Sequence, residues 1–311
     1  TGDGQTWTPD GQDFAGDGLF PIAIAGSPTQ PNRTCAASSI SAREAIGFCV
    51  SCAAVKLLLT NDDGVRADGI NVLASTLSEI AEVYVVAPDR ERSATSHSFT
   101  LFDPLRVEKV GHHVWSVSGT PADCAYLGVL EFCKGADLVI SGINHGYNLG
   151  ADIFYSGTVA AAVESALRGY PAIAMSMGMG RGADFHRAAQ FCKSLVQGMK
   201  GRRLPPRTLL SVNVPGPKEP PPPADGPAYQ ITRLGERMYR DHVDSRTDPR
   251  GITYYSIGGP VATDSEPPGT DVHAIHQGLI SVTPLGLDLT HRALLGDLPT
   301  WDVPGYRQVE A

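Results

Sequence analysis

The 311-residue chain lacks the patterns that identify several common classes of protein. No apolar run approaches the ~20 residues that span a bilayer, and the N-terminus shows no basic segment followed by an apolar one, the mark of a secretory signal. The glycine-containing loop after the first expected strand is not G-x-G-x-x-G, and no G-x-x-x-x-G-K-[ST] occurs. We therefore expect a cytoplasmic protein without a membrane partner, and neither dinucleotide nor P-loop binding is supported.

Positive charge is also scarce. Twenty-five Lys and Arg residues face 33 Asp and Glu residues, which leaves a formal net charge of −8, and no basic run occurs. An acidic surface repels nucleic acid, so we expect no nucleic-acid partner. A phosphorylated substrate would need its charge handled locally, by backbone N–H groups and a metal ion.

The six cysteines are scattered along the chain, which fits reduced thiols better than a disulfide framework. Cys49 and Cys52 have the C-x-x-C spacing of a zinc knuckle or a redox pair. A second pair at metal spacing is missing, and so is a flanking βαβ pattern. We interpret this spacing as chance.

The first methionine is Met175, and residues 1–54 are rich in Gly, Thr, Ser, Ala and Pro. We expect this segment to be a disordered N-terminal extension. An alternative hypothesis is that translation begins near Val55 from another start codon, which would make residues 1–54 upstream read-through. Residues 55–311 are then the folded domain.

From Val55 onward, apolar strands alternate with amphipathic helices. Strands are expected at 56–60, 83–87, 114–117, 138–141, 172–176 and 209–212, and helices at 69–80, 121–132, 158–167 and 185–199. This alternation predicts an α/β fold, with a three-layer Rossmann-like, mostly parallel sheet. A proline-rich stretch, 215–227, ends the pattern. Strand-like segments at 229–234, 253–257 and 279–283 then predict a β-rich appendage, either a hairpin arm or an extension of the sheet.

Polar clusters follow these strands where each one ends. Asp62 and Asp63 come directly after the first strand, and Ser93 lies in the loop after the second. The loop after residue 141 contains Asn144, and Ser156 precedes the Ala-rich helix. Because parallel strands end at one edge of the sheet, these side chains should converge there. Two adjacent acids at such a point suit a hard divalent cation.

Each cluster also has an ordinary structural explanation. Asp-Asp-Gly is a common turn, and Ser156 could be a plain helix cap. His97 and His145 fit surface or hydrogen-bonding histidines better than general bases. The occurrence of four such clusters at one predicted edge is what favours a functional site.

Five motifs in order resemble the SurE survival-protein family of 5′/3′-nucleotidases, which are acid phosphatases. They are TNDDG at 60–64, APDRERS at 87–93, GTPADC at 119–124, SGINHGYNLG at 141–150 and YSGTVAAA at 155–162. The resemblance runs from about Val55 to about Leu287. Many members have Ser-Gly where this chain has Ser93-Ala94, a departure that we expect to matter little.

The resemblance implies a SurE-like fold and a metal-dependent phosphatase of nucleoside 5′-monophosphates, and of 3′-monophosphates as a further substrate class. It implies one divalent cation per subunit, Mg²⁺ or Mn²⁺, held by Asp62, Asp63, Ser93 and Asn144. Asp62 and Asp63 are then also the catalytic residues, with Asp62 the better candidate for orienting the attacking water.

Phosphate oxygens would meet a cradle formed by Gly142, Asn148, Ser156, Gly157 and Thr158. The resemblance also implies a homodimer or homotetramer in which the β-rich arm, within residues 215–311, is exchanged between subunits. Two alternatives remain open: a hydrolase of another phosphate ester, such as short-chain polyphosphate, and a non-catalytic nucleotide-binding module.

Overall fold

The structure is a computed structural model of the chain. It describes residues 55–180, 184–221, 229–236, 242–259, 266–301, 303–305 and 307. The expected N-terminal extension, residues 1–54, lies outside the described residues, as does the Cys49–Cys52 spacing. Cys124, Cys133 and Cys192, the cysteines that are described, are buried free thiols.

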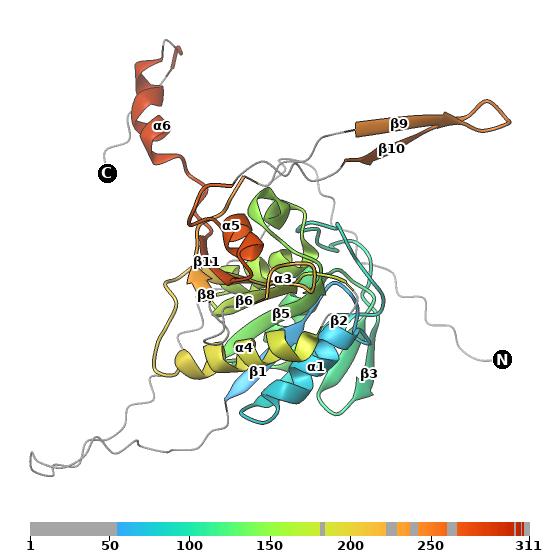
Figure 1. Cartoon of the computed structure of the whole chain (residues 1–311), viewed down its shortest axis with the longest axis vertical. Helices are drawn as coiled ribbons and strands as arrows, with labels where there is room; N and C mark the ends of the chain where they lie inside the picture. The colour runs from blue at the N-terminus through green and yellow to red at the C-terminus, as the bar shows by residue number, and fades with distance from the viewer. Residues whose placement is uncertain are drawn as a thin grey trace, which may run out of the picture. The chain divides into compact units, whose positions relative to one another are not determined.

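One nine-stranded sheet organises the molecule, in the order β3-β4-β2-β1-β5-β6-β7-β11-β8 (Figure 1). Its strands are β1 (Lys56–Thr60), β2 (Glu82–Pro88), β3 (Val107–Gly111), β4 (Val114–Val117), β5 (Leu138–His145), β6 (Ala172–Met177), β7 (Thr208–Val214), β8 (Tyr229–Ile231) and β11 (Ile280–Gly286). The central strands are parallel, whereas β3 pairs antiparallel with β4 and β11 with β7. The predicted α/β class with a mostly parallel sheet is confirmed.

Helices cover both faces of this sheet. The helical elements are α1 (Asp68–Leu77), α2 (Pro121–Leu127) with a π-helical continuation (Gly128–Phe132), a 3₁₀ turn (Gly150–Phe154), α3 (Gly157–Leu167), α4 (Phe185–Gly198), α5 (Asp271–His276), α6 (Arg292–Asp297) and a second 3₁₀ turn (Leu298–Thr300). None of the described helices has the length and apolarity needed to cross a bilayer.

The apolar runs bury both faces of the central strands. Leu57 and Leu59 of β1 point into a core shared with α1 and α4, which lie side by side on one face (Figure 1). Leu58, between them, belongs to the opposite core, which α2 covers. This division follows from the two-residue period of a strand. It explains why these strands have continuous apolar sequences rather than alternating ones.

The α2 helix begins as its sequence predicts. The Thr120 hydroxyl accepts a hydrogen bond from the Asp123 N–H at 3.1 Å, and the Asp123 carboxylate accepts one from the Thr120 N–H at 2.8 Å. Pro121 occupies the first helical position, where its missing N–H costs nothing. This reciprocal capping box fixes the start of the helix.

The C-terminal part contains both forms of the expected appendage. Strands β8 and β11 extend the main sheet, whereas β9 (His242–Thr247) and β10 (Thr253–Gly258) form a separate antiparallel hairpin. Every residue of its two strands is exposed. The sequence did not predict β3, β9 and α6, which have no buried side chains, or α5, which is only six residues long.

Strand β5 is longer than predicted, which corrects the expectation that a loop begins at Ser141. The strand continues to His145, with irregular pairing to β6 between Ser141 and Asn144. Gly142, with φ of +133°, allows this because a Cβ there would lie 2.2 Å from the Met175 carbonyl oxygen of β6. Gly142 thus allows the backbones of β5 and β6 to approach closely.

We expect Gly69→Ala to destabilise the protein by roughly 1–3 kcal/mol, because an added Cβ at this α1 position would lie 2.1 Å from the Ile143 carbonyl oxygen. Gly198→Ala in α4 is the matched control, since its Cβ would have no neighbour within 4 Å. That variant should be neutral or slightly stabilised. Urea unfolding of both variants measures the difference, and equal midpoints would contradict the close approach.

Candidate metal and phosphate site

Asp62 and Asp63 lie on a turn that Asn61 holds rigid at the end of β1. The Asn61 side chain donates to the Gly64 carbonyl at 2.9 Å and accepts from the Gly64 N–H at 3.2 Å. Asn61 is fully buried and Asp62 is 5% exposed. The two carboxylates therefore stand at a fixed place on the carboxyl edge of the sheet.

This place is the topological switch point of the sheet. Strand β1 pairs with β2 on one side and β5 on the other, and the strand order runs outward in opposite directions from there. Thr60 is in register with Ser141, so the residues that follow each strand are neighbours. Open α/β sheets bind ligands in the crevice at such a point.

The N-terminus of α3 lies directly against Asp62. The Thr158 hydroxyl donates a short hydrogen bond to the Asp62 carboxylate. A Cβ at Gly157 would lie 2.9 Å from the Asp62 Cβ, so only glycine permits this approach. Ser156 caps the helix by accepting from the Val159 N–H at 3.1 Å. The first N–H groups of a helix have no partner within it, which suits them to an anion.

The loop after β2 brings Ser93 to the same place. The Arg92 N–H donates to the Asp62 backbone carbonyl at 2.7 Å, one residue before Ser93. The Ser93 hydroxyl donates to Glu91 at 2.7 Å. Glu91, which was not predicted from the sequence, is a third acid whose charge acts on both Asp62 and Asp63. The position of Glu91, two residues before Ser93, was the sequence signal that could have placed this acid near the site.

The end of β5 meets Asp63. The His145 N–H donates to the Asp63 carboxylate at 3.2 Å, and the His145 ring Nδ1 lies 3.9 Å from the same group. The Asn144 side-chain nitrogen donates to the Gly146 carbonyl at 3.0 Å, which fixes the orientation of the amide. Backbone contacts thus bring all four predicted metal ligands to the same edge of the sheet.

Asn148, predicted to bind phosphate, also makes structural hydrogen bonds. Its side-chain nitrogen donates to the Ser176 hydroxyl at 2.7 Å, and its backbone exchanges two hydrogen bonds with the Asn213 side chain. These contacts pin the segment after β5 to β6 and β7. A role for Asn148 and Gly142 in phosphate binding stays a prediction.

The paired acids occupy a strongly acidic environment. Burial, together with repulsion from Asp63, raises the pKa of Asp62 to about 6, although the Thr158 hydrogen bond opposes this. Burial also raises the pKa of Asp63, against the effect of the neighbouring His145. Neither acid has a lysine or arginine ion-pair partner among the described residues. The charge thus favours a bound cation.

The donors present fit a hard divalent cation. The predicted set offers two carboxylates, a hydroxyl and an amide oxygen, and Mg²⁺ typically takes one or two carboxylates and keeps several waters. Within the described ranges, no three His, Cys, Asp or Glu side chains are grouped to hold a metal. The oxygen donors of the predicted set themselves favour an ion such as Mg²⁺ or Mn²⁺.

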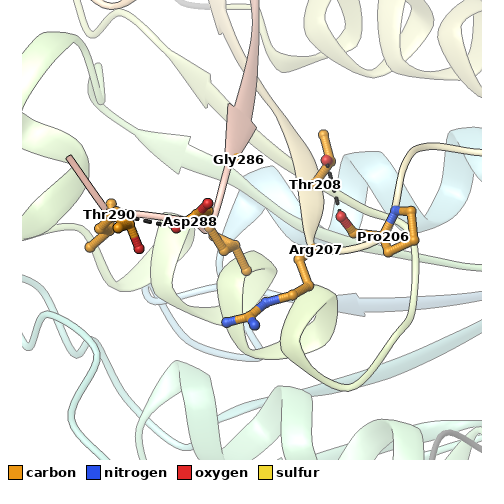
Figure 2. Close-up of a pocket in the computed structure, with 8 residues that line it drawn as sticks. Pro206, Arg207, Thr208, Gly286, Asp288 and Thr290 are labelled. Carbon is orange, nitrogen blue, oxygen red and sulfur yellow. Dashed lines mark hydrogen bonds between the residues drawn. The ribbon is translucent and has the colours of Figure 1, made fainter. Parts of the chain in front are cut away.

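A hollow lies at the edge of the sheet opposite to the paired acids. Figure 2 shows Pro206, Arg207 and Thr208 at the start of β7 facing Gly286, Asp288 and Thr290 at the end of β11. Because β7 runs parallel to β1, its start lies away from the carboxyl edge. None of the predicted site residues lines this hollow.

Fold and site together define a three-layer α/β protein with an acidic, oxygen-donor site beside a helix N-terminus. The family model described as "Survival protein SurE" matches residues 57–241. The chain belongs to the SurE family.

Individual relatives agree with this assignment. A chain from Myxococcus xanthus named 5′-nucleotidase SurE is 46% identical over 82% of this chain and 96% of its own length. A chain of the same name from Geobacter metallireducens is 48% identical over 80% of this chain and 98% of its own. The crystal structure of the SurE protein from Aquifex aeolicus matches with a TM-score of 0.69 and 39% identity, covering 79% of this chain and 98% of that one.

We expect Asp62→Asn to stabilise the metal-free protein above pH 6. The folded-state pKa of Asp62 lies above its ordinary value of 3.8, so ionising it costs folded stability as pH rises from about 4 to about 6. Above that window the free energy of unfolding of Asp62→Asn should exceed that of the wild type by about 1–3 kcal/mol. Below it the two values should be almost equal.

Urea unfolding in EDTA at pH 4 and pH 8 checks this expectation. Asp137→Asn is the matched control, because Asp137 is exposed and binds the Lys56 N–H at the opposite end of the same strands. A gain of equal size at both pH values would contradict the burial argument.

Proposed function

We propose that this chain is a divalent-metal-dependent phosphomonoesterase that hydrolyses nucleoside 5′-monophosphates to nucleoside and phosphate. The observation that carries the proposal is the near-full-length likeness to chains named 5′-nucleotidase SurE. The acidic site beside the α3 N-terminus supports it, because a phosphate ester needs both a cation and backbone N–H donors.

In this proposal one Mg²⁺ or Mn²⁺ ion per subunit is held by Asp62, Asp63, Ser93 and Asn144. When bound, such an ion lowers the pKa of its water and offsets the charge gained in the transition state. The raised pKa values of the two acids support this assignment, since a cation relieves the unfavourable charge of both carboxylates.

The chain's own groups position the substrate. The first N–H groups of α3, from Gly157 and Thr158, bind phosphate oxygens, and the Ser156 hydroxyl adds a further donor. Gly142 and Asn148 complete the proposed cradle. The Thr158 hydroxyl holds the Asp62 carboxylate in place through one of its oxygens, which leaves the other oxygen to face the cation and the attacking water.

We also propose that the β9–β10 hairpin is the oligomerisation arm of a homodimer or homotetramer. A lone two-stranded hairpin is at best marginally stable in water. Val243, Tyr254, Tyr255 and Ile257 of this hairpin are between 56% and 91% exposed. Contact with a second copy would bury these apolar side chains, and light scattering of the purified protein measures the assembly.

We expect phosphate release from AMP and GMP with Mn²⁺ and none with EDTA. Asp63→Asn should lower kcat/KM roughly a hundredfold or more, because it removes a charged ligand from the cation. Asp137→Asn, the same substitution at the opposite edge, should retain wild-type turnover. Full activity of Asp63→Asn would overturn the ligand assignment.

A substrate panel separates the proposal from its alternatives. Wild-type protein is given AMP, 3′-AMP and short-chain polyphosphate at equal phosphate concentration, with calorimetry of AMP binding in parallel. Faster release from polyphosphate than from AMP would identify another phosphate-ester hydrolase. Binding of AMP without release would identify a nucleotide-binding module.

A further inference from the structure

The loop that carries Ser93 has an unfavourable backbone conformation. Ala94 and Ser96 both adopt left-handed φ values, 55° and 54°. This region is disfavoured for residues with a Cβ, and such residues persist only where surrounding contacts hold them. Arg92 anchors the segment on one side, through its hydrogen bond to Asp62. The other side needs an anchor as well.

That second anchor begins at Ser96 and His97. The Ser96 N–H donates to the Tyr155 carbonyl at 3.2 Å, and the Ser96 hydroxyl donates to the Phe154 carbonyl at 2.6 Å. His97 Nε2 lies 3.0 Å from the Glu164 carboxylate of α3. The loop is therefore tied to the helix whose N-terminus lies against Asp62.

Glu164 is a buried acid that the proposed chemistry does not use. Its side chain is 6% exposed, and its other oxygen accepts a hydrogen bond from Arg168 at 2.8 Å. Burial alone would raise the pKa of Glu164, but the hydrogen bonds from His97 and Arg168 lower it below its ordinary value. The carboxylate is thus ionised and forms a charge-assisted hydrogen bond with His97.

Further contacts connect the surroundings of Glu164 to the loop that carries Ser93. The Arg168 guanidinium lies 4.5 Å from the ring centroid of Tyr126 on α2. Phe99, two residues after His97, meets the same ring edge-on at 5.1 Å. His97 and Phe99 therefore clamp the loop to α3 and α2 immediately after its two left-handed residues.

We propose that the His97–Glu164 hydrogen bond is a positioning tether that holds Ser93 where the cation binds. This inference rests on the proposed function, because it assumes that Ser93 is a metal ligand. His97 touches neither cation nor substrate in this assignment. Its effect passes through the Ala94–Ser96 backbone, which relaxes from its left-handed conformation when the tether is cut.

The expected result is a split between metal affinity and turnover. His97→Ala should weaken Mn²⁺ binding about tenfold, the size expected when one charge-assisted hydrogen bond is lost. At saturating Mn²⁺ the ion itself orders the loop, so kcat for AMP should return to within about threefold of wild type. His97→Gln, whose amide can still donate to Glu164, should restore most of the affinity.

The experiment measures Mn²⁺ binding to the substrate-free full-length chain by calorimetry, and kcat for AMP over a range of Mn²⁺ concentrations. His186→Gln is the matched control, since His186 is an exposed surface residue paired with Asp184 at the start of α4. Amide hydrogen exchange adds a readout that is independent of activity. Residues 93–98 should exchange faster in His97→Ala, with the β1 and β5 strands unchanged.

Wild-type Mn²⁺ affinity in His97→Ala would overturn the tether. So would an affinity in His97→Gln as weak as that of His97→Ala, because the hydrogen bond would then not be the cause. If wild-type protein itself neither binds Mn²⁺ nor releases phosphate, the proposed function fails, and the inference fails with it. If only the tether inference is wrong, the wild-type protein still binds Mn²⁺ and releases phosphate from AMP.

Discussion

The unfavourable burial of two neighbouring carboxylates is the constraint on which the rest of this site depends. Asp62 and Asp63 stand together at the end of a buried strand, with Glu91 close by and no lysine or arginine ion-paired to either acid in the described part of the chain. Three other segments hold the acids: the Thr158 hydroxyl and the His145 N–H each donate to a carboxylate, and the Arg92 N–H donates to the Asp62 backbone carbonyl. These hydrogen bonds offset only part of the negative charge of the two carboxylates, so a bound cation would stabilise them further.

The topology of the sheet explains why these three segments are the ones available. Strand β1 lies between β2 and β5, so the loops that follow those two strands flank the acids. Helix α3 packs beside α2 and against β6, which aims its N-terminus at the same edge. Asp62 and Thr158 thereby become neighbours although about a hundred residues separate them in the chain.

Much of this arrangement could be predicted from the sequence because local signals carry it. The central strands are continuous apolar runs, and α2 begins with a complete capping box. Strand β3 was missed because its residues are nearly all exposed, and α5 because it has fewer than two turns. The His97–Glu164 pair and the structural contacts of Asn148 depend on contacts between distant segments, which no local pattern reports. The metal and phosphate roles of the predicted residues stay predictions.

Gly157 gives the site a further property. Because the start of α3 approaches Asp62 at the limit of contact, the separation between the acids and the helix N-terminus is set by the absence of one methyl group. No side-chain choice at that position can widen the gap by a small step, since alanine already collides with the acid. Gly157 therefore fixes the spacing between the paired acids and the first N–H groups of α3, so a ligand that contacts both must fit one set distance.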